Sequence, residues 1–369
     1  MNSSTKASLI YITNIPSPYN FDLFESLSKY FILNVYYFDK IESDRFWNLN
    51  IITNIYSSKI LKKDIFTFLF RKIHHQLYFN IECLQICLTS KSDNVILSGT
   101  YFSPNIILSI FILKLRNKNI FWFGEKISPN KSKLKYYLKY ILFSPIRLCV
   151  SKIFAVGNVA SNSYQSFGFK KEIISTPYSI NNSKFQNTKI NKYENKLVLL
   201  TSGSLIYRKG VDIIINALNT LSENMLSKIE FWVIGDGPEK DNLINICSKF
   251  LKVKFFGFIQ PHDLHKYFLQ SDIFIFCSRY DGWGVVINEA LASGLPIIVS
   301  KYCGSSEYID SDGGYIVNNS VDLVSDKIKY LCENEIIRKR MGSYNLRKSK
   351  YISSEVIAKK IYNAIIIKA

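Results

Sequence analysis

The sequence predicts an α/β protein built from two Rossmann-like domains. Its 369 residues are more than a single hydrophobic core usually organises. Short apolar, β-rich runs alternate with longer amphipathic stretches in both halves, and residues 181–196 between the halves are polar and without periodicity. Strands that alternate with helices are typical of parallel sheets joined by right-handed crossovers. We expect a first domain over residues 1–185, a second over 196–349, and a C-terminal helix within 350–369 that packs back on the first.

The individual elements follow from the same alternation. In the first half, helices such as 20–30 and 104–115 separate five expected strands, at residues 8–13, 33–38, 94–97, 120–123 and 153–155. In the second half the expected strands are 196–202, 228–234, 252–257, 272–278 and 296–300. The helices between them are expected at 211–221, 240–250, 264–270 and 283–293.

Composition and charge narrow the classes of function. Hydrophobic residues make up 47% and charged residues 21%, as in globular proteins. Lys and Arg number 47 against 29 Asp and Glu, and the resulting net charge of +18 favours an anionic partner: nucleic acid, phospholipid headgroups or a diphosphate. No nucleic-acid reading motif accompanies the charge, so a nucleic-acid-binding protein is kept only as the alternative from a different class.

Other classes lack their signatures. No apolar run reaches the roughly 18 residues that a bilayer-spanning helix needs, and the N-terminus lacks the order of a signal peptide, so we expect a cytoplasmic protein. Cys83 and Cys87 lie one helical turn apart without a second ligand pair, which favours reduced packing residues over a metal site. The G-x-G-x-x-G of dinucleotide-dependent oxidoreductases is absent after the first strand.

Two segments of the first half interleave basic and aromatic residues. Residues 59–79 and 131–152 mix Lys and Arg with Tyr, Phe, Leu and Ile. The pattern fits an interfacial surface, with basic groups on anionic headgroups and aromatic groups at the acyl boundary. It equally fits ordinary helices that pack one side on the sheet, and the sequence leaves both interpretations open.

The second half carries polar residues where its strands end, which is where ligands collect in open α/β sheets. After the strand that ends at Ser202, Arg208 and Lys209 stand just before a helix. Two cations at that position fit a diphosphate, although the same residues also occur in solvated turns. The run VIGDGP at 233–238 is either a ligand contact or a tight strand-to-helix corner.

A third loop joins glycines to two carboxylates. Asp281 precedes Gly284, whose neighbouring N–H groups open a helix, and Glu289 follows one to two turns later. Because a carboxylate accepts hydrogen bonds from vicinal hydroxyls, the spacing fits a sugar near Asp281, a diphosphate at Gly284 and a ribose near Glu289. The alternative is a capped helix with a solvated Glu289.

Four motifs in order over residues 197–306, GSLIYRKG, VIGDGP, FFGFI and DGWGVVINEALASGLP, resemble the second domain of glycosyltransferase family 4, also called group 1. The opening NIPSPYNFDLFESL resembles the first acceptor-side loop of that family. The resemblance implies the GT-B fold, with two facing Rossmann-like domains and an interdomain cleft. It also implies transfer of a sugar from a nucleotide donor, with retention of anomeric configuration and without a metal or other cofactor.

The resemblance assigns roles on the donor side. Lys209 matches the lysine that neutralises the leaving diphosphate, and the backbones of Gly284 and Val285 match the phosphate donors. Glu289 matches the acid that holds the ribose. Asp281 occupies the place of the acid that holds the donor sugar, where the family usually has Glu.

Further positions complete the implied site. Ser204 stands where many members have a phosphate-binding arginine, and we expect Arg208 to compensate from the next turn. The nucleotide base would lie against residues 257–259, including Ile259. On the acceptor side, the matching loop contains Ser17, Tyr19 and Asn20.

The first domain lacks the histidine that many family members place at a strand end, because the histidines at 74, 75, 262 and 265 do not fit that position. Glu125 stands there instead. It would position an acceptor hydroxyl or stabilise positive charge at the anomeric carbon, unless it is a surface loop carboxylate.

Together these expectations describe a glycosyltransferase that moves a hexosyl-type sugar from a nucleotide diphosphate sugar to a polyprenyl-diphosphate-linked glycan in surface polysaccharide synthesis. The enzyme would be peripheral on the inner face of the cytoplasmic membrane, which is anionic. The same chemistry on a small soluble acceptor is the alternative.

Overall fold

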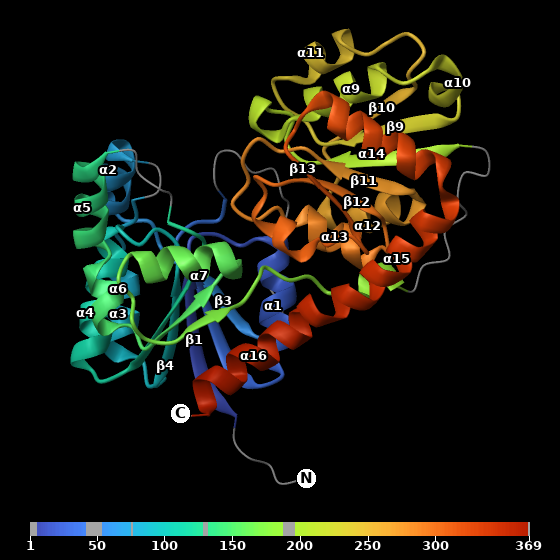
Figure 1. The fold of residues 1–369 in the computed structure, drawn as a ribbon. Coiled ribbons are helices and arrows are strands. Elements are labelled where there is room, and N and C mark those ends of the chain that lie inside the picture. The colour runs from blue at the N-terminus through green and yellow to red at the C-terminus, as the bar shows by residue number, and fades with distance from the viewer. Residues whose placement is uncertain (1–5, 42–53, 75–76, 128–131, 187–195, 368–369) are drawn as a thin grey trace, which may run out of the picture. The chain divides into compact units, whose positions relative to one another are not determined.

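Two compact units make up the chain (Figure 1). The computed structural model describes residues 6–41, 54–74, 77–127, 132–186 and 196–367. Unit 1 comprises Met1–Tyr178 and Ile357–Ala369, and unit 2 comprises Ser179–Val356. Each unit has a parallel sheet with its own helices, so the predicted α/β architecture of two Rossmann-like domains is confirmed.

The sheet of unit 1 has seven parallel strands in the order β3-β2-β1-β4-β5-β6-β7. The strands are β1 (Ala7–Thr13), β2 (Phe31–Tyr37), β3 (Ser57–Ile60), β4 (Asn94–Ser98), β5 (Asn119–Gly124), β6 (Lys152–Ala155) and β7 (Ile173–Ser175). The central strands are apolar on both faces, as expected where helices cover both sides of a parallel sheet. The sequence predicted the five inner strands and missed the two edge strands, β3 and β7.

The helices of unit 1 follow its strands. They are α1 (Pro18–Ser28), α2 (Ile65–Ile73), α3 (Ile81–Thr89), α4 (Pro104–Leu115), α5 (Lys133–Leu142), α6 (Ser144–Cys149) and α7 (Gly157–Ser166). Helices α3, α4 and α6 pack over a core that includes Val95, Ile110 and Trp122. Pro104 occupies the first turn of α4, where its missing N–H costs no hydrogen bond.

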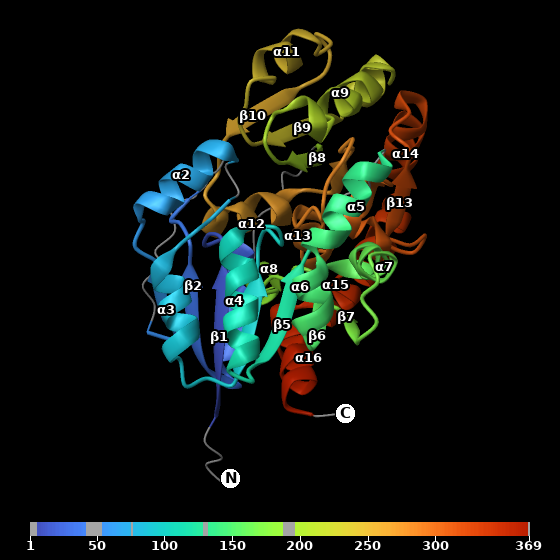
Figure 2. The same ribbon diagram turned by 90° about the vertical axis from the view of Figure 1, so that its left-hand side faces the viewer.

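Helix α16 (Ser354–Ile366) brings the C-terminal segment to unit 1 (Figures 1 and 2). The ring of Tyr362 stacks on Tyr30 at 4.9 Å between centroids and meets the edge of Phe31 at 5.5 Å. Lys360 Nζ donates to the carbonyl oxygen of Ser175 at 2.7 Å. The preceding residues 350–356 belong to unit 2.

The sheet of unit 2 has six parallel strands in the order β10-β9-β8-β11-β12-β13. They are β8 (Leu197–Ser202), β9 (Ile229–Ile234), β10 (Val253–Gly257), β11 (Ile273–Phe276), β12 (Ile297–Ser300) and β13 (Gly314–Val317). Successive residues of β8 serve opposite faces: Leu199 lies in one apolar cluster and Leu200 in the other. The edge strand β13 was not predicted.

The two faces of this sheet carry different helices. One cluster packs α9 (Val211–Asn219) and α14 (Val321–Glu333), and the other packs α12 (Pro261–Gln270) and α13 (Val286–Ala292). The remaining helical segments are α10 (Glu223–Leu226), α11 (Lys240–Asn245), α15 (Glu335–Ser349) and the short turns at Tyr207–Lys209, Gly304–Tyr308 and Lys350–Ile352. Helix α13 begins three residues later than predicted, and α11 ends five residues earlier.

Helix α8 (Ser183–Gln186) lies inside the stretch that the sequence reads as a linker. Phe185 packs its ring against Phe268 at 6.3 Å, and Asn182 Nδ2 donates to the carbonyl oxygen of Ser349 at 2.9 Å. Residues 179–186 therefore belong to unit 2, whereas residues 187–195 of the linker lie outside the described residues.

Among the described residues, no helix combines the length and the apolar character that crossing a bilayer requires. All seven cysteines are free thiols, and the described part of the chain holds no group of three His, Cys, Asp or Glu side chains suited to a metal ion.

Candidate functional site

Each sheet has one point where its strand order reverses. In unit 1 this point lies between β1 and β4, and in unit 2 it lies between β8 and β11. Doubly wound sheets bind ligands beyond the carboxyl ends of the strands at that point. Residues 203–210 follow β8 and residues 277–285 follow β11, so the predicted donor loops flank the reversal in unit 2.

These two loops are bonded to each other. The backbone N–H of Arg279 donates to the carbonyl oxygen of Arg208 at 2.8 Å, and Ser278 Oγ donates to the same oxygen at 3.0 Å. In return, the guanidinium of Arg208 donates to the carbonyl oxygen of Tyr280 at 2.7 Å. The backbone around Arg208 and Lys209 is thus fixed against the loop that carries Asp281.

Asp281 lies under two cations. Its Oδ2 accepts from Lys209 Nζ at 2.5 Å and lies 3.5 Å from an Arg208 guanidinium nitrogen. Asp281 is only 8% exposed, and a buried carboxylate costs free energy unless it is paired. The structure therefore brings together three predicted site residues from motifs more than 70 residues apart.

The VIGDGP turn packs against the first donor loop. The N–H of Leu205 donates to the carbonyl oxygen of Asp236 at 2.8 Å, and the N–H of Gly203 donates to that of Ile234 at 3.0 Å. A Cβ on Gly235 would lie 1.9 Å from the carbonyl oxygen of Gly203. This glycine therefore serves the contact between loops. Ser204, in the same loop, is exposed.

The turn before α13 is fixed from the segment after β12. Ser305 Oγ donates to the carbonyl oxygen of Gly284 at 3.1 Å, and Cys303 Sγ donates to that of Trp283 at 2.9 Å. Burial raises the pKa of Cys303 to about 11, so its thiol stays protonated and acts as a donor. Neither Cys303 nor Ser305 was predicted from the sequence, although the run CGSS after a strand end was a visible signal.

Glu289 lies in the first turn of α13 and is half-buried. The sequence placed it one to two turns into a longer helix; the helix begins only at Val286, so Val285 is the N-cap residue. Ile259 follows β10, is half-buried and packs against the cluster under α12 and α13. Nearby, the carbonyl oxygen of Gly257 accepts from the N–H of Gly235 at 2.8 Å.

On unit 1, the loop after β1 lies at the reversal point of that sheet. Ser17 is the N-cap residue of α1 and is 2% exposed. Its hydroxyl oxygen has no hydrogen-bond partner among the described residues, while its carbonyl oxygen accepts from the N–H of Asn20 at 3.0 Å. The side chains of Tyr19 and Asn20 are partly exposed.

Tyr178 connects this loop to Glu125. Its ring lies 4.6 Å from that of Tyr19 between centroids, and its hydroxyl donates to Glu125 Oε1 at 2.9 Å. Burial, together with the Glu125 charge, raises the pKa of Tyr178 well above its usual range, so this phenol remains a donor. Tyr178 was not predicted as a site residue. It lies 53 residues from Glu125 in the chain, and no local sequence pattern indicates a contact over that separation.

Glu125 is exposed at the end of β5, and its backbone is held from α7. Tyr164 Oη donates to the Glu125 carbonyl oxygen at 2.7 Å and accepts from Trp122 Nε1 at 3.0 Å. The carboxylate therefore projects from a fixed backbone.

The predicted site residues form two sets, one on each unit. Ser17, Tyr19, Asn20 and Glu125 belong to unit 1; the other set, on unit 2, comprises Ser204, Arg208, Lys209, Ile259, Asp281, Gly284, Val285 and Glu289. Three histidines lie in the described residues, at 74, 262 and 265, and none stands in a loop at either reversal point. His75 lies outside the described residues.

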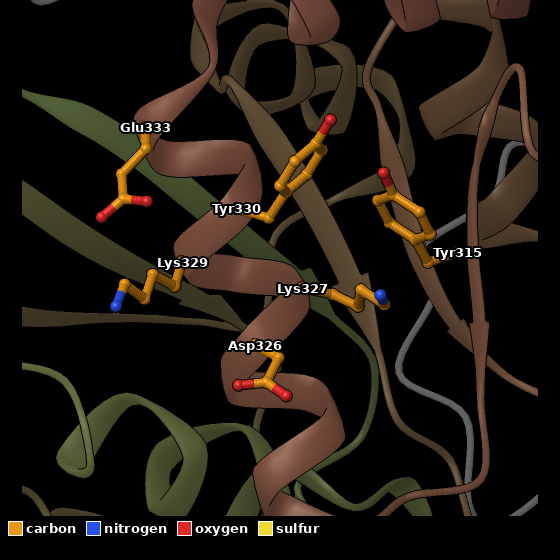
Figure 3. A pocket seen from close by; sticks show the side chains of 6 residues that line it. All are labelled: Tyr315, Asp326, Lys327, Lys329, Tyr330 and Glu333. Atoms are coloured by element: carbon orange, nitrogen blue, oxygen red, sulfur yellow. The ribbon is translucent and has the colours of Figure 1, made fainter.

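A surface hollow of about 420 Å³ lies elsewhere on unit 2 (Figure 3). It is lined by Tyr315 of the edge strand β13 and by residues of α14, namely Asp326, Lys327, Lys329, Tyr330 and Glu333. The lining mixes charges of both signs, and it contains none of the predicted site residues.

Comparisons with known proteins agree with this arrangement. Residues 182–348 match the family model of the glycosyl transferases group 1. An uncharacterised protein of the cps region of Klebsiella pneumoniae is 26% identical over 71% of this chain and 70% of its own length. Lipopolysaccharide glucosyltransferase WaaG of Escherichia coli is 29% identical over 42% of this chain and 40% of its own.

A solved structure extends the likeness to the whole fold. Anabaena HepE, in complex with UDP, is 14% identical and superposes with a TM-score of 0.76 over 97% of this chain and 99% of its own. At this identity the likeness shows the fold alone. Residues 182–348 are therefore similar to the glycosyl transferases group 1, and the chain has the two-domain GT-B fold.

Proposed function

We propose that the protein transfers a hexosyl sugar from a nucleoside diphosphate sugar to a glycan acceptor, as a retaining, metal-independent member of family 4. The observation that carries the proposal is the cluster of Arg208, Lys209 and Asp281 at the reversal point of the unit 2 sheet. Two cations and a carboxylate at that place suit the two chemically different ends of such a donor, its diphosphate and its sugar hydroxyls.

The leaving group would be the nucleoside diphosphate. Lys209 and Arg208 would bind its phosphate oxygens and stabilise the charge that develops as the glycosidic bond breaks. Arg208 rather than the exposed, uncharged Ser204 would supply the second cation. Asp281 would accept hydrogen bonds from hydroxyls of the transferred sugar.

The rest of the donor would follow the edge of the same sheet. The backbone of Gly284 and Val285 would face the phosphates, Glu289 would accept from the ribose hydroxyls, and the base would lie against Ile259. Since HepE was solved with UDP and with UDP-glucose, uracil is the first base to test.

On unit 1, Ser17, Tyr19 and Asn20 would contact the acceptor. Glu125, oriented by Tyr178, would position the incoming hydroxyl or stabilise positive charge at the anomeric carbon. The hydroxyl would attack on the face from which the diphosphate departs, so that retention requires no protein nucleophile.

For the acceptor, we propose a polyprenyl-diphosphate-linked glycan of surface polysaccharide synthesis, reached at the cytoplasmic face of the membrane. The names of two relatives, which refer to a cps region and to lipopolysaccharide, support this class. The excess of basic residues supports an anionic, lipid-linked acceptor over a neutral one. A lipid-free assay with sugar phosphates distinguishes the alternative of a small soluble acceptor.

A panel of nucleotide sugars tests the donor. We expect one UDP- or GDP-sugar to raise the melting temperature of the wild type, and Glu289→Ala to abolish that rise. Glu333→Ala, which removes a carboxylate of the hollow in Figure 3, serves as the matched control and should keep the response. If no nucleotide sugar stabilises the wild type, the proposal is wrong.

A further inference from the structure

Helix α2 turns its apolar side chains outward. Thr67 is 4% exposed, whereas its neighbour Phe68 is 60% exposed. The hydroxyl of Thr67 donates to the carbonyl oxygen of Phe79, and its N–H donates to Asp64 Oδ1 at 2.8 Å. The exposed apolar residues of the helix are Ile65, Phe66, Phe68 and Leu69.

Ion pairs on the inner side hold α2 in this orientation. Arg71 pairs with Asp39, and Lys63 Nζ lies 2.9 Å from the other carboxylate oxygen of Asp39. The Asp39 side chain is only 4% exposed, and the Arg71 guanidinium lies 5.6 Å from the ring centroid of Tyr78. Rotating the helix to cover its apolar face would leave Asp39 buried without these cations, and a buried charge without a partner is strongly destabilising.

Helix α5 has the same inverted arrangement. It has no buried residue, and it contacts unit 1 through Tyr136, whose hydroxyl donates to the carbonyl oxygen of Ser166 at 3.2 Å, and Tyr140, which lies under the Arg147 guanidinium at 3.8 Å. Its opposite side carries Leu134, Tyr137, Leu138 and Ile141 at helical spacing, and all four are exposed. The sequence left open whether these helices pack their apolar side on the sheet; the structure shows that they do not.

Positive charge surrounds both apolar faces. The exposed lysines of α2 and the turn before it are 62, 63 and 72, and those of α5 are 133 and 135. Residues 132–149 include no acid, and Asp64 is the only acid in 59–74. Both helices stand on the side of unit 1 that lies at the left in Figure 1, and Figure 2 turns that side to the viewer.

We infer that these two helices form a docking surface for an anionic lipid bilayer, with the apolar side chains inserted at the acyl boundary and the lysines on the headgroups. We call it the α2–α5 surface, defined by Ile65, Phe66, Phe68, Leu69, Leu134, Tyr137, Leu138 and Ile141 with the lysines 62, 72, 133 and 135, whereas Lys63 stays paired with Asp39. Exposed apolar faces bordered by basic groups gain free energy from both contacts. The inference names the surface that would bring the enzyme to a lipid-linked acceptor, and it does not depend on the transfer chemistry.

Vesicle co-sedimentation tests this inference. The wild type should bind phosphatidylcholine vesicles that contain phosphatidylglycerol and should bind pure phosphatidylcholine much more weakly, because each lysine adds about a fivefold preference for anionic headgroups. Phe68→Glu and Leu138→Glu, one on each helix, should each weaken binding about tenfold or more. The control is Ile336→Glu, a residue 82% exposed on α15 of unit 2, which should bind like the wild type.

Several outcomes would overturn the inference. One is a wild type that shows no binding to anionic vesicles, and another is binding by all three variants that equals that of the wild type. A third such outcome is a wild type that does not bind lipid but forms a dimer in light scattering, with Phe68→Glu monomeric. The last result would assign the surface to a second copy of the chain. Because all three sites are exposed, circular dichroism should show the wild-type fold in each variant.

A second observation concerns Arg279 and rests on the proposed function. Its guanidinium donates to both carboxylate oxygens of Asp212, at 2.8 and 2.6 Å, and to the carbonyl oxygen of Tyr207 at 2.6 Å. It also lies 3.8 Å above the Tyr207 ring. Tyr207 precedes Arg208 and Lys209 in the chain, and Asp212 follows them in the first turn of α9. Arg279 therefore bonds to residues on both sides of the cation pair.

The geometry points to Arg279 as a positioning residue for the diphosphate-binding cations. It fixes the backbone of Arg208 and Lys209 without contacting the donor itself. The planar guanidinium of Arg279 donates to both Asp212 oxygens and to the Tyr207 carbonyl oxygen at the same time. The ammonium group of a lysine does not reproduce this set of hydrogen bonds.

A double-mutant cycle tests this role. Arg279→Lys should lower kcat/KM for the donor about tenfold to a hundredfold, because misplaced catalytic groups lose rate steeply. In a Lys209→Ala background the same change should cost almost nothing. Arg338→Lys, at an arginine that donates to the carbonyl oxygens of Leu331 and Cys332, is the control and should keep full activity.

The outcomes separate this inference from the proposed function. Full activity in Arg279→Lys, or equal losses in both backgrounds, would overturn the positioning role while leaving the transferase intact. A wild type that shows no donor affinity would overturn the proposed function, and this inference with it.

Discussion

The carboxylate of Asp281 and the phosphates of a donor would compete for the same cations. Lys209 Nζ lies 2.5 Å from Asp281 Oδ2, and Arg208 approaches the same oxygen at 3.5 Å. A diphosphate that enters must therefore draw these cations away from Asp281 or share them with it. Asp281 would then weaken the binding of the diphosphate and strengthen the binding of the sugar.

Asp281→Asn separates the two contributions. We expect UDP to bind the variant about 5- to 150-fold more tightly, since a charge-assisted contact that holds Lys209 back is worth about 1–3 kcal/mol. Turnover should fall, because the amide replaces the carboxylate that we propose accepts hydrogen bonds from the sugar. Calorimetry with UDP and a product assay measure the two effects. Weaker UDP binding together with undiminished turnover would contradict the assignment.

At single positions, the sequence identified residues whose neighbours in the chain form a motif and missed those that act across it. Lys209 and Asp281 were predicted as site residues because each stands in a run with a recognisable order. The contacts of Tyr178 and Arg279 were missed because their partners, Glu125 and Asp212, lie 53 and 67 residues away. Nothing in a local pattern encodes such a contact.

The turn between β11 and α13 depends on a glycine with a positive backbone angle. Gly284 has φ of +84°, and a Cβ there would lie 2.6 Å from Cys303 Sγ. Gly257 has a similar φ of +69°, but a Cβ there would meet nothing within 4 Å. An alanine would therefore be conformationally strained at both positions, but it would overlap a neighbouring side chain only at Gly284.

Gly284→Ala should therefore be worse than Gly257→Ala. The strain of a left-handed alanine, about 1–2 kcal/mol, applies to both, and the overlap with Cys303 adds to it only at Gly284. We expect both variants to melt at a lower temperature than the wild type, with the larger decrease in Gly284→Ala. Equal decreases in the melting temperature of the two variants would contradict this account of the turn.

A carboxylate on β9 ties that strand to its neighbour β10. Burial would raise the pKa of Glu230, but hydrogen bonds from Lys254, Trp232 and Lys252 outweigh it and lower the pKa to about 2. Because the folded-state pKa lies below the unfolded one, this group stabilises the fold above the unfolded pKa of about 4.3. That contribution is lost as the pH falls toward 2.

Glu230→Gln should remove this pH dependence. At pH 7 the variant should lose about 2 kcal/mol of unfolding free energy, in the range of hydrogen bonds to a charged group. The gap to the wild type should close as the pH falls from about 4.3 toward 2. Urea unfolding of both proteins at several pH values measures it. A gap that stays constant with pH would show that the charge of Glu230 contributes nothing.

Among whole elements, the sequence predicted all the inner strands of both sheets and missed three of the four edge strands. The strands β3, β7 and β13 have three or four residues each, and most of their side chains are only partly buried, so no continuous apolar run marks them. The late start of α13 has another cause. Gly284 has a positive φ that a helix does not allow, and hydrogen bonds from Cys303 and Ser305 hold the carbonyl groups of Trp283 and Gly284 in a turn.

Over the whole molecule, the alternation of strands and helices was enough to predict two Rossmann-like domains, because the order of elements largely determines this architecture. The sheet orders and the packing of α16 follow from contacts between distant segments. The family motifs are concentrated in residues 197–306, and the inverted helices α2 and α5 are recognised only from side-chain exposure.

Separate cores predict separate responses in the two units. Tyr362→Ala removes the stacking on Tyr30 and the contact with Phe31, and should destabilise unit 1 by about 2–4 kcal/mol. The donor site, with its reversal point on unit 2, should still bind UDP with wild-type affinity. Calorimetric unfolding with and without UDP measures both. A loss of UDP affinity as large as that in Glu289→Ala would contradict the independence of the site.

The division of unit 1 into two pieces of chain also affects how the protein is made. Residues 1–178 leave the ribosome first, yet Tyr30 and Phe31 lack their cover until residues 357–369 have been synthesised. At about 5–20 residues per second, all of unit 2 is translated during that delay of roughly ten to forty seconds. Part of the apolar surface of residues 1–178 therefore stays uncovered during this time. Unit 2 is completed before unit 1, although its synthesis begins later.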